Sequence, residues 1–172
     1  PVIGDIELFA QARADLPAHK VVGITGTNGK STTTALIHHI LDTAGMPARL
    51  GGNIGLPILG QDPLPEGGVY VLELSSYQID LTRSLDCDVA LLLNLTPDHL
   101  DRYEGFAGYA ASKARLFTMQ AKGHAAVIGI GDAPSAAIAR QVEVTGRGED
   151  LVKIAPGGCL DQSRWPALQG PH

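Results

Sequence analysis

The segment that says most about the fold is Gly23-Ile24-Thr25-Gly26-Thr27-Asn28-Gly29-Lys30-Ser31-Thr32. It joins the short apolar run Val21–Ile24 to Ser31–Ala44, which has the composition and spacing of an amphipathic helix. Glycines let a backbone wrap closely round an anion, and the N-terminus of a following helix presents unpaired N–H groups and a positive dipole end. The order of strand, glycine loop and helix therefore predicts an α/β fold with a phosphate-binding loop.

The loop departs from the common pattern G-x-x-x-x-G-K-[ST] at one position, because Ile24 stands where the first glycine belongs. In such a loop Lys30 bridges the terminal phosphates and the Ser31 hydroxyl ligates Mg²⁺. The simpler alternative is a glycine turn in which Ser31 caps the helix. The coincidence of strand, glycines, Lys-Ser and helix favours a site for a nucleoside triphosphate.

Short apolar runs alternate with helix-length stretches along the chain. This alternation predicts a doubly wound, mostly parallel sheet with helices on both faces and ligands at the carboxyl ends of the strands. From Arg140 onward the chain is rich in Gly and Pro and predicts only weak strands and turns. The expected strands are 21–24, 69–72, 89–93 and 125–130, and the expected helices are 31–44, 76–85 and 108–120.

Polar residues cluster directly after three of the expected strands, in Thr25–Ser31, Glu73–Ser76 and Asn94–Asp101. Because the strands are expected to be parallel, all three clusters should lie at one edge of the sheet. A carboxylate at Glu73 would face the phosphate loop and could complete a Mg²⁺ shell. The alternative is that Ser75-x-x-Gln78 is a capping box that starts the next helix, with Glu73 solvated.

Two further residues have less decided roles. His99 lies between Asp98 and Asp101, and it could be a general base, a metal ligand or a salt-bridged loop residue. Lys113 lies among small residues in an expected helix, where the default interpretation is a solvated surface lysine. The residues alone leave both questions open.

The bulk composition narrows the class of protein. A chain of 172 residues with 44% hydrophobic and 18% charged residues is long and apolar enough for one domain with a buried core. A net charge of −5 gives no general affinity for nucleic acid or an anionic membrane. Cys87 and Cys159 are far apart, which fits a reducing, cytoplasmic compartment. No apolar run approaches the ~18–20 residues that span a bilayer, and no leader precedes the first element.

Together these blocks resemble the Mur ligases, which join amino acids to UDP-muramoyl precursors, and their relative folylpolyglutamate synthetase. The resemblance rests on Thr25–Ser31, including the missing first glycine, and on Asn94-x-x-x-Asp98-His99-x-Asp101. Gly52-Asn53-Ile54-Gly55 and Glu73-Leu74-Ser75-Ser76-Tyr77-Gln78 resemble the D-glutamate-adding branch of the family, and Gly4–Phe9 resembles the entry into its central domain. The resemblance is strong up to about Met119 and weak beyond it.

The resemblance implies roles for individual residues. Catalysis falls to Lys30, Glu73, His99 and Lys113. One Mg²⁺ is held by Ser31 and Glu73, and a second by His99 and Lys113, with Lys113 carrying a carbamate that turns an ammonium into an oxygen ligand. The substrate is contacted by Asn53, Ser75 and Gln78. The phosphates of ATP are held by Gly26, Thr27, Asn28, Gly29, Lys30, Ser31 and Thr32.

The resemblance also implies an activity and a domain organisation. The expected reaction adds D-glutamate to UDP-N-acetylmuramoyl-L-alanine in peptidoglycan synthesis, with consumption of ATP and an acyl-phosphate intermediate. The expected enzyme is a cytoplasmic monomer with small-molecule substrates and no nucleic-acid or membrane partner. Residues 1–19 are expected to enter from a UDP-binding N-terminal domain. Residues 20–172 form an incomplete ATP-binding central domain that is inactive without a C-terminal amino-acid domain.

Two alternatives and two departures accompany this interpretation. The chain could belong to a folylpolyglutamate synthetase-like ligase, which the residues after Glu73 disfavour, or to a non-catalytic P-loop nucleotide-binding module, for which His99 and Lys113 have no evident use. Gly129-Ile130-Gly131-Asp132 is more glycine-rich than the family pattern, so its role is open. Leu168–His172 resembles a family motif that normally continues with Asn.

Overall fold

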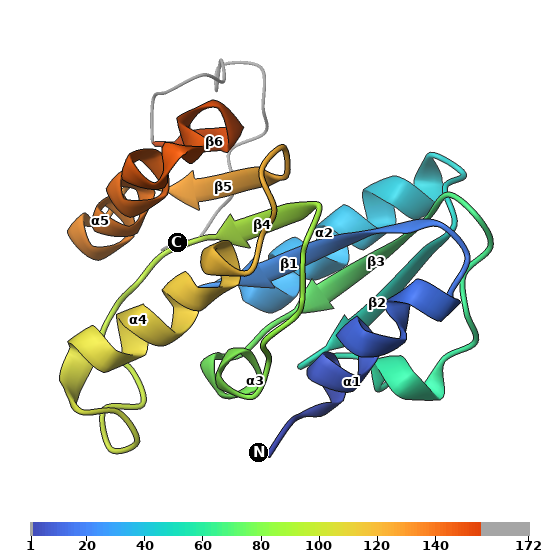
Figure 1. The fold of residues 1–172 in the computed structure, drawn as a ribbon, viewed down its shortest axis with the longest axis horizontal. Coiled ribbons are helices and arrows are strands. Elements are labelled where there is room, and N and C mark those ends of the chain that lie inside the picture. Colours follow the sequence, from blue (N-terminus) through green and yellow to red (C-terminus); the bar gives the residue numbers. More distant parts are fainter. Residues whose placement is uncertain (1, 156–172) are drawn as a thin grey trace.

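The structure is a computed structural model and describes residues 2–155. One six-stranded sheet, with the strand order β2-β3-β1-β4-β5-β6, runs through the molecule, and every neighbouring pair is parallel (Figure 1). The expectation of a doubly wound parallel α/β fold is confirmed. The strands are β1 (His19–Thr25), β2 (Ala48–Gly52), β3 (Gly68–Glu73), β4 (Val89–Leu92), β5 (Ala125–Gly129) and β6 (Leu151–Ile154).

Helices cover the two faces of the sheet unequally. Behind the sheet in Figure 1 lies α2, and its Ile37 and Leu41 pack against Ile24, Val69 and Val71. The other face carries α1, α3, α4 and α5 over the larger core cluster. The helices are α1 (Asp5–Ala12), α2 (Lys30–Thr43), α3 (Ser76–Asp80), α4 (Gly105–Thr118) and α5 (Ala133–Val142), with 3₁₀ turns at Arg13–Asp15, Ile58–Gly60 and Gly148–Asp150 and a π turn at Glu143–Arg147.

The strand register brings the ends of three strands level. Ile24 of β1 lies opposite both Glu73 of β3 and Leu91 of β4. The phosphate loop, the residues after Glu73 and the loop after β4 therefore leave the sheet side by side. This is the common edge that the three polar clusters predict.

Several elements differ from the sequence expectation. The helix expected over 76–85 ends at Asp80, and α4 begins at Gly105, three residues earlier than expected. No pattern predicted α1, β2 or α5. Strand β2 was missed because it is a short edge strand that includes Arg49 and two glycines. Cys159 and the motif-like segment 168–172 lie outside the described residues.

The glycine-rich segment after β5 has structural roles. A Cβ on Gly129 would lie 2.3 Å from the carbonyl oxygen of Leu93, so only glycine fits there. Asp132 caps α5 by accepting a hydrogen bond from the Ser135 N–H at 2.7 Å, and it also accepts one from the Leu95 N–H in the loop after β4 at 3.1 Å. Backbone proximity and helix capping thus account for Gly129 and Asp132, the first and last residues of this segment.

Two findings bear on compartment and membrane. Cys87 is a buried free thiol, and burial raises its pKa to about 12, which makes it chemically inert. Among the described residues, no helix combines the length and apolar character that crossing a bilayer requires.

Candidate functional site

The carboxyl edge of the sheet carries a pocket of about 230 Å³. Side chains from five separate segments of the chain line this pocket. Five of the lining residues were predicted from the sequence to act in the site. The lining residues are Lys30, Asn53, Ser75, Ser76, Tyr77, Asp98, His99, Tyr109 and Lys113.

The phosphate loop has the geometry of an anion cradle. Gly26 and Gly29 have φ angles of +149° and +82°, which favour glycine, and Gly29 is the N-cap of α2. Helix geometry leaves the first N–H groups of α2, from Lys30 onward, without partners inside the helix. Ser31 and Thr32 lie in this exposed first turn. The predicted phosphate-binding loop therefore has the expected backbone shape.

Two side chains of the loop have specific contacts. Lys30 folds back over the loop, and its Nζ donates to the carbonyl of Thr27 at 2.9 Å. The N–H of Asn28 is already bonded to Oδ1 of Asn94 at 2.9 Å. An anion in this loop would therefore meet the N–H groups from Gly29 onward, and Asn28 has only its side chain left to offer.

Glu73 is buried at the end of β3, with 1% of its surface exposed. Its Oε1 accepts a hydrogen bond from Asn53 Nδ2 at 2.8 Å, while its Oε2 is buried with no hydrogen-bond partner in the structure. The alternative of a solvated Glu73 is therefore wrong. A buried carboxylate oxygen without a partner is costly unless a cation completes it, so this group fits the predicted Mg²⁺ ligand.

The segment after Glu73 forms the predicted capping box. Ser75 Oγ accepts from the Gln78 N–H at 3.2 Å, and Gln78 Oε1 accepts from the Ser75 N–H at 3.1 Å. Ser75 also lines the pocket, and Gln78 is not among the lining residues. Capping therefore engages both side chains, and substrate contact by Asn53, Ser75 and Gln78 stays a prediction.

His99 lies at the mouth of the pocket in an unusual backbone conformation. Its φ is +51°, in the left-handed region that few non-glycine residues adopt. Its Nδ1 lies 3.1 Å from the hydroxyl of Tyr77, and its Nε2 lies 3.5 Å from Asp98 Oδ2. The ring is part of the same pocket as Lys113, so the structure brings together the two residues predicted to share a metal.

Lys113 is buried, with 1% of its surface exposed, so the default interpretation of a surface lysine is wrong. Its Nζ donates to Thr25 Oγ1 at 3.2 Å and lies 4.9 Å from the centre of the Tyr109 ring. Burial, reinforced by the positive charge of Lys30, lowers the pKa of Lys113 to about 7. Helix α4 thus places an amine in the site that gives up its proton far more readily than an exposed lysine.

Sequence reasoning missed Tyr109, and it named Asn94 only as the first residue of a polar cluster, without a role. Tyr109 is buried one helical turn before Lys113, and its hydroxyl lies 3.2 Å from Thr27 Oγ1; burial raises the pKa of its phenol. Asn94 bonds the backbone of the phosphate loop. The i, i+4 spacing of Tyr109 and Lys113 was the available signal for the tyrosine.

The described residues contain no group of three or more His, Cys, Asp and Glu side chains that could hold a metal. The few oxygen donors at this edge, such as the Glu73 carboxylate and the Ser31 hydroxyl, fit Mg²⁺ bound together with a nucleotide. Mg²⁺ is usually held by one or two carboxylates plus phosphates and water. Ser31 and Glu73 could serve one such ion, and His99 with a modified Lys113 another.

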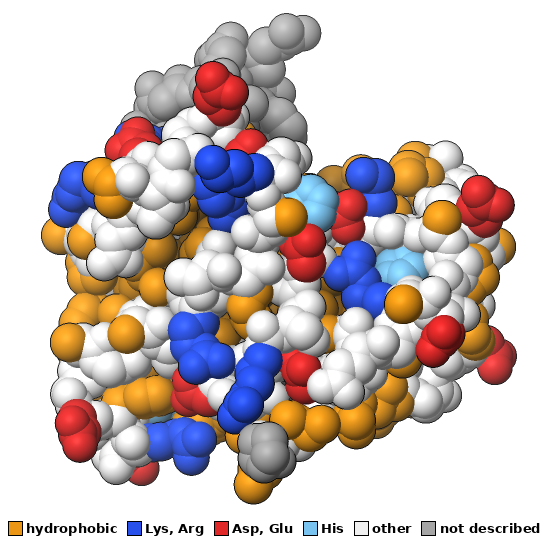
Figure 2. All heavy atoms as spheres, viewed as in Figure 1, with side chains coloured by type: hydrophobic (Ala, Val, Ile, Leu, Met, Phe, Trp, Pro, Cys, Tyr) orange, Lys and Arg blue, Asp and Glu red, His pale blue; other side chains and the backbone are white. Residues whose placement is uncertain are grey.

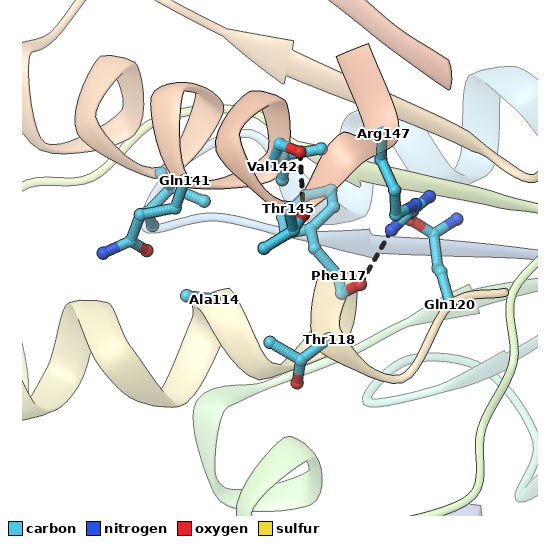
Figure 3. Close-up of a pocket in the computed structure, with 9 residues that line it drawn as sticks. Ala114, Phe117, Thr118, Gln120, Gln141, Val142, Thr145 and Arg147 are labelled. Atoms are coloured by element: carbon cyan, nitrogen blue, oxygen red, sulfur yellow. Dashed lines mark hydrogen bonds between the residues drawn. The ribbon is translucent and has the colours of Figure 1, made fainter. Parts of the chain in front are cut away.

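A second hollow lies away from this edge, between α4 and α5. Figure 2 shows apolar side chains gathered there, and Figure 3 shows the lining residues of its inner end. Its buried charged group is already engaged: Arg147 donates to the carbonyls of Phe117 and His124 and to Gln120 Oε1, all within 3.1 Å. This hollow offers packing surface and no convergent reactive groups.

The family of the chain follows from a comparison with protein-family models. Residues 24–151 match the model described as the Mur ligase middle domain. The UDP-N-acetylmuramoylalanine--D-glutamate ligase of Novosphingobium aromaticivorans is 71% identical over all 172 residues, which span 39% of that protein. The ligase of the same name from Caulobacter vibrioides is 50% identical over 98% of this chain and 36% of its own length. The chain thus spans well under half of the curated relatives it matches.

Solved structures of ligases share the fold of this chain. A UDP-N-acetylmuramoyl-L-alanyl-D-glutamate--2,6-diaminopimelate ligase superimposes with a TM-score of 0.68 at 25% identity, covering 87% of this chain and 35% of that one. The MurF ligase from Thermotoga maritima in complex with ADP superimposes with a TM-score of 0.62 at 19% identity, covering 88% and 35%. The match to the family model over residues 24–151 and the 71% identity to a curated ligase show that the chain belongs to the Mur ligase family.

Proposed function

We propose that this chain is the ATP-binding part of an ATP-dependent ligase that adds D-glutamate to UDP-N-acetylmuramoyl-L-alanine in peptidoglycan synthesis. One observation carries the proposal: a single pocket joins Lys30 of the phosphate loop to His99 and Lys113. The names of the similar ligases supply the substrates. Because the chain spans 39% of such a relative, the activity is proposed for the complete protein.

The chemistry follows from the resistance of a carboxylate to attack by an amine. The carboxylate of the muramoyl-alanine substrate attacks the γ-phosphorus of ATP, ADP leaves, and an acyl phosphate forms. The amine of D-glutamate then attacks the acyl carbon, loses a proton, and inorganic phosphate departs. Lys30, at the N-terminus of α2, would neutralise charge on the phosphates. No covalent enzyme intermediate is required.

Magnesium ions would be held by Ser31 with Glu73 and by His99 with Lys113. Bound Mg²⁺ would neutralise phosphate charge during the transfer. An unprotonated amine is what CO₂ requires for carbamate formation, in which the Lys113 nitrogen bonds to carbon and releases one proton. The lowered pKa of Lys113 supports this modification. Asn53, Ser75 and Gln78 are proposed to contact the muramoyl substrate beside this pocket.

Membership of the Mur ligase family also suggests a compartment and an oligomeric state. We infer a cytoplasmic monomer whose partners are its small-molecule substrates. The buried thiol of Cys87 fits a reducing compartment but does not require one. Figure 2 shows Lys, Arg, Asp and Glu side chains interspersed over the face in view, with no continuous basic surface that would attract nucleic acid.

The test has two stages. Mg·ATP is titrated into this chain by calorimetry beside Lys30→Ala, and saturable binding that is lost in the variant supports the nucleotide site. The complete protein is then assayed for ADP release with UDP-N-acetylmuramoyl-L-alanine and either D- or L-glutamate. Turnover with D-glutamate alone is expected. Turnover only with a folate and L-glutamate would instead support the folylpolyglutamate synthetase alternative, and nucleotide binding without any turnover would support a non-catalytic module.

A further inference from the structure

A hydrogen-bonded bridge joins the phosphate loop to the loop that follows β4. The side chain of Asn94 spans the backbone of Asn28: its Oδ1 accepts from the Asn28 N–H at 2.9 Å, and its Nδ2 donates to the Asn28 carbonyl at 3.0 Å. One amide thereby satisfies both polar groups of one backbone residue. We call this pair the Asn94 bridge.

Three further hydrogen bonds run beside the Asn94 bridge. The Thr27 N–H donates to the Asn94 carbonyl at 2.9 Å. The Thr27 hydroxyl accepts from the Thr96 N–H at 3.0 Å and donates to the Thr96 carbonyl at 3.1 Å. Two consecutive residues of the phosphate loop are thus tied to the loop after β4 through both backbone and side chain.

The two loops carry different parts of the site. After Asn28, the chain turns through Gly29 into the free N–H groups of α2. Three residues after Thr96, the other loop reaches His99, whose φ of +51° is costly for a residue with a Cβ. Such a conformation persists only where the surrounding contacts fix it. On the β4 side of His99, the bonds at Thr96 and Asn94 anchor its loop to the phosphate loop, and the bond from Leu95 to Asp132 anchors it to the start of α5.

We propose that Asn94 is a positioning residue that holds the phosphate loop in its anion-binding shape and fixes the His99 loop to it. The proposal rests on the proposed function, because it assumes that the loop binds ATP. Asn94 itself need not touch the nucleotide. By ordering both loops before binding, the bridge removes part of the entropy that ATP would otherwise spend on ordering them.

Calorimetry with Mg·ATP tests the binding effect of Asn94→Ala and Asn94→Asp. We expect roughly tenfold weaker binding for Asn94→Ala, the size of effect given by losing one or two net hydrogen bonds. Asn94→Asp should bind more weakly still, because its carboxylate would face the Asn28 carbonyl and repel the nucleotide. Affinity within about twofold of the parent chain for Asn94→Ala would overturn the proposal.

Gln120→Ala is the matched control. Gln120 is also a side-chain amide that ties two backbone segments, through the carbonyls of Cys87 (2.8 Å) and Ala125 (3.0 Å), but it does so at the opposite edge of the sheet. It should lower the unfolding midpoint while leaving ATP affinity within about twofold. If Gln120→Ala weakened ATP binding as much as Asn94→Ala, general destabilisation would explain both, and the positioning role would be wrong.

Hydrogen exchange provides a readout that nucleotide contact alone does not move. Without nucleotide, Asn94→Ala should speed exchange of the Asn28 amide and of the amides of Thr96, Asp98 and His99, while Gln120→Ala leaves both segments unchanged. Faster exchange at Asn28 alone would overturn the link to His99. A parent chain that binds no Mg·ATP would remove the nucleotide site under both proposals, whereas normal parent binding with an unaffected Asn94→Ala would overturn only this one.

Discussion

Lys113 has a charge state set by its surroundings more than by its own chemistry. It is buried beside Thr25 and over the Tyr109 ring, with the positive charge of Lys30 close enough to disfavour a second cation. Because the pKa of Lys113 in the folded chain is lowered to about 7, protonated Lys113 destabilises the fold below that pH, and this cost disappears as the pH rises toward the unfolded value. A buried amine that costs stability is expected where its reactivity is used.

The carbamate proposed at Lys113 leads to a prediction. In the complete protein, Lys113→Ala should lower turnover at least ~100-fold, because the proposed oxygen ligand of a catalytic metal would be lost. Short carboxylates such as acetate or formate should partly restore activity, since they can occupy the vacated space and supply that oxygen. The measurement is ADP release with increasing carboxylate concentration.

Lys122→Ala is a suitable control, because Lys122 belongs to the turn before β5 at the far edge of the sheet. The activity of Lys122→Ala should equal that of the parent protein and should not change when a carboxylate is added. Full activity in Lys113→Ala would show that no ligand is supplied from this position.

At the scale of elements, the end of β2 depends on close contact with the end of β3. Gly52 has a φ of +91°, and a Cβ on it would lie 2.1 Å from the carbonyl oxygen of Glu73. The next residue, Asn53, donates its N–H to that same carbonyl at 2.8 Å and its side-chain amide to the Glu73 carboxylate. Two strand ends thus meet so closely that the orientation of the Glu73 carboxylate depends on a glycine in the neighbouring strand.

Gly52→Ala should therefore be costly. It combines backbone strain of about 1 kcal/mol with a backbone clash, so we expect the free energy of unfolding to fall by more than ~2 kcal/mol. Gly45→Ala separates the two effects, because Gly45 has a φ of +74° and a Cβ added there would meet no atom within 4 Å. Urea unfolding of both variants measures the difference. Equal losses would mean that β2 moves away from Glu73 without penalty.

In the molecule as a whole, the buried carboxylate of Glu7 joins α1 to the segment between α3 and β4. Glu7 Oε2 accepts from the N–H groups of Arg83 and Ser84, and its Oε1 accepts from the Ser84 hydroxyl and from Gln11. Burial alone would raise the pKa of Glu7, but these hydrogen bonds outweigh it and lower the pKa to about 2. The N-terminal helix thereby depends on an ionised group.

This arrangement predicts an acid-sensitive fold. The stabilisation by Glu7 is complete above about pH 4.5 and is lost as the pH falls toward about 2, because the unfolded chain takes up the proton first. The full effect is of the order of 3 kcal/mol. Urea unfolding between pH 2 and 7 should show this loss, and Glu7→Gln should be less stable at neutral pH and lack that part of the acid dependence. Glu66→Gln, at an exposed position, should follow the parent curve; an identical slope in Glu7→Gln would refute the role.

The phosphate loop, the parallel sheet and the shared edge of its polar clusters could all be predicted from the amino-acid sequence. These features depend on local patterns: glycines before Lys-Ser, apolar runs of strand length, and polar residues directly after them. Family resemblance then pointed to His99 and Lys113. The capping box at Ser75 and Gln78 was also readable, because its partners are three residues apart.

The burial of these side chains and the groups that they contact depend on tertiary folding, and the sequence does not reveal them. Lys113 is buried because Thr25 and Tyr109 surround it, and Glu73 keeps an unpartnered oxygen because Asn53, 20 residues away, takes the other. The Asn94 bridge joins residues 66 positions apart. The sequence did not predict helices α1 and α5 or strand β2, because their stability comes mainly from packing against the sheet and hydrogen bonding to it. Contacts between distant segments leave no periodic signal in a single sequence, and they set the chemistry of this site.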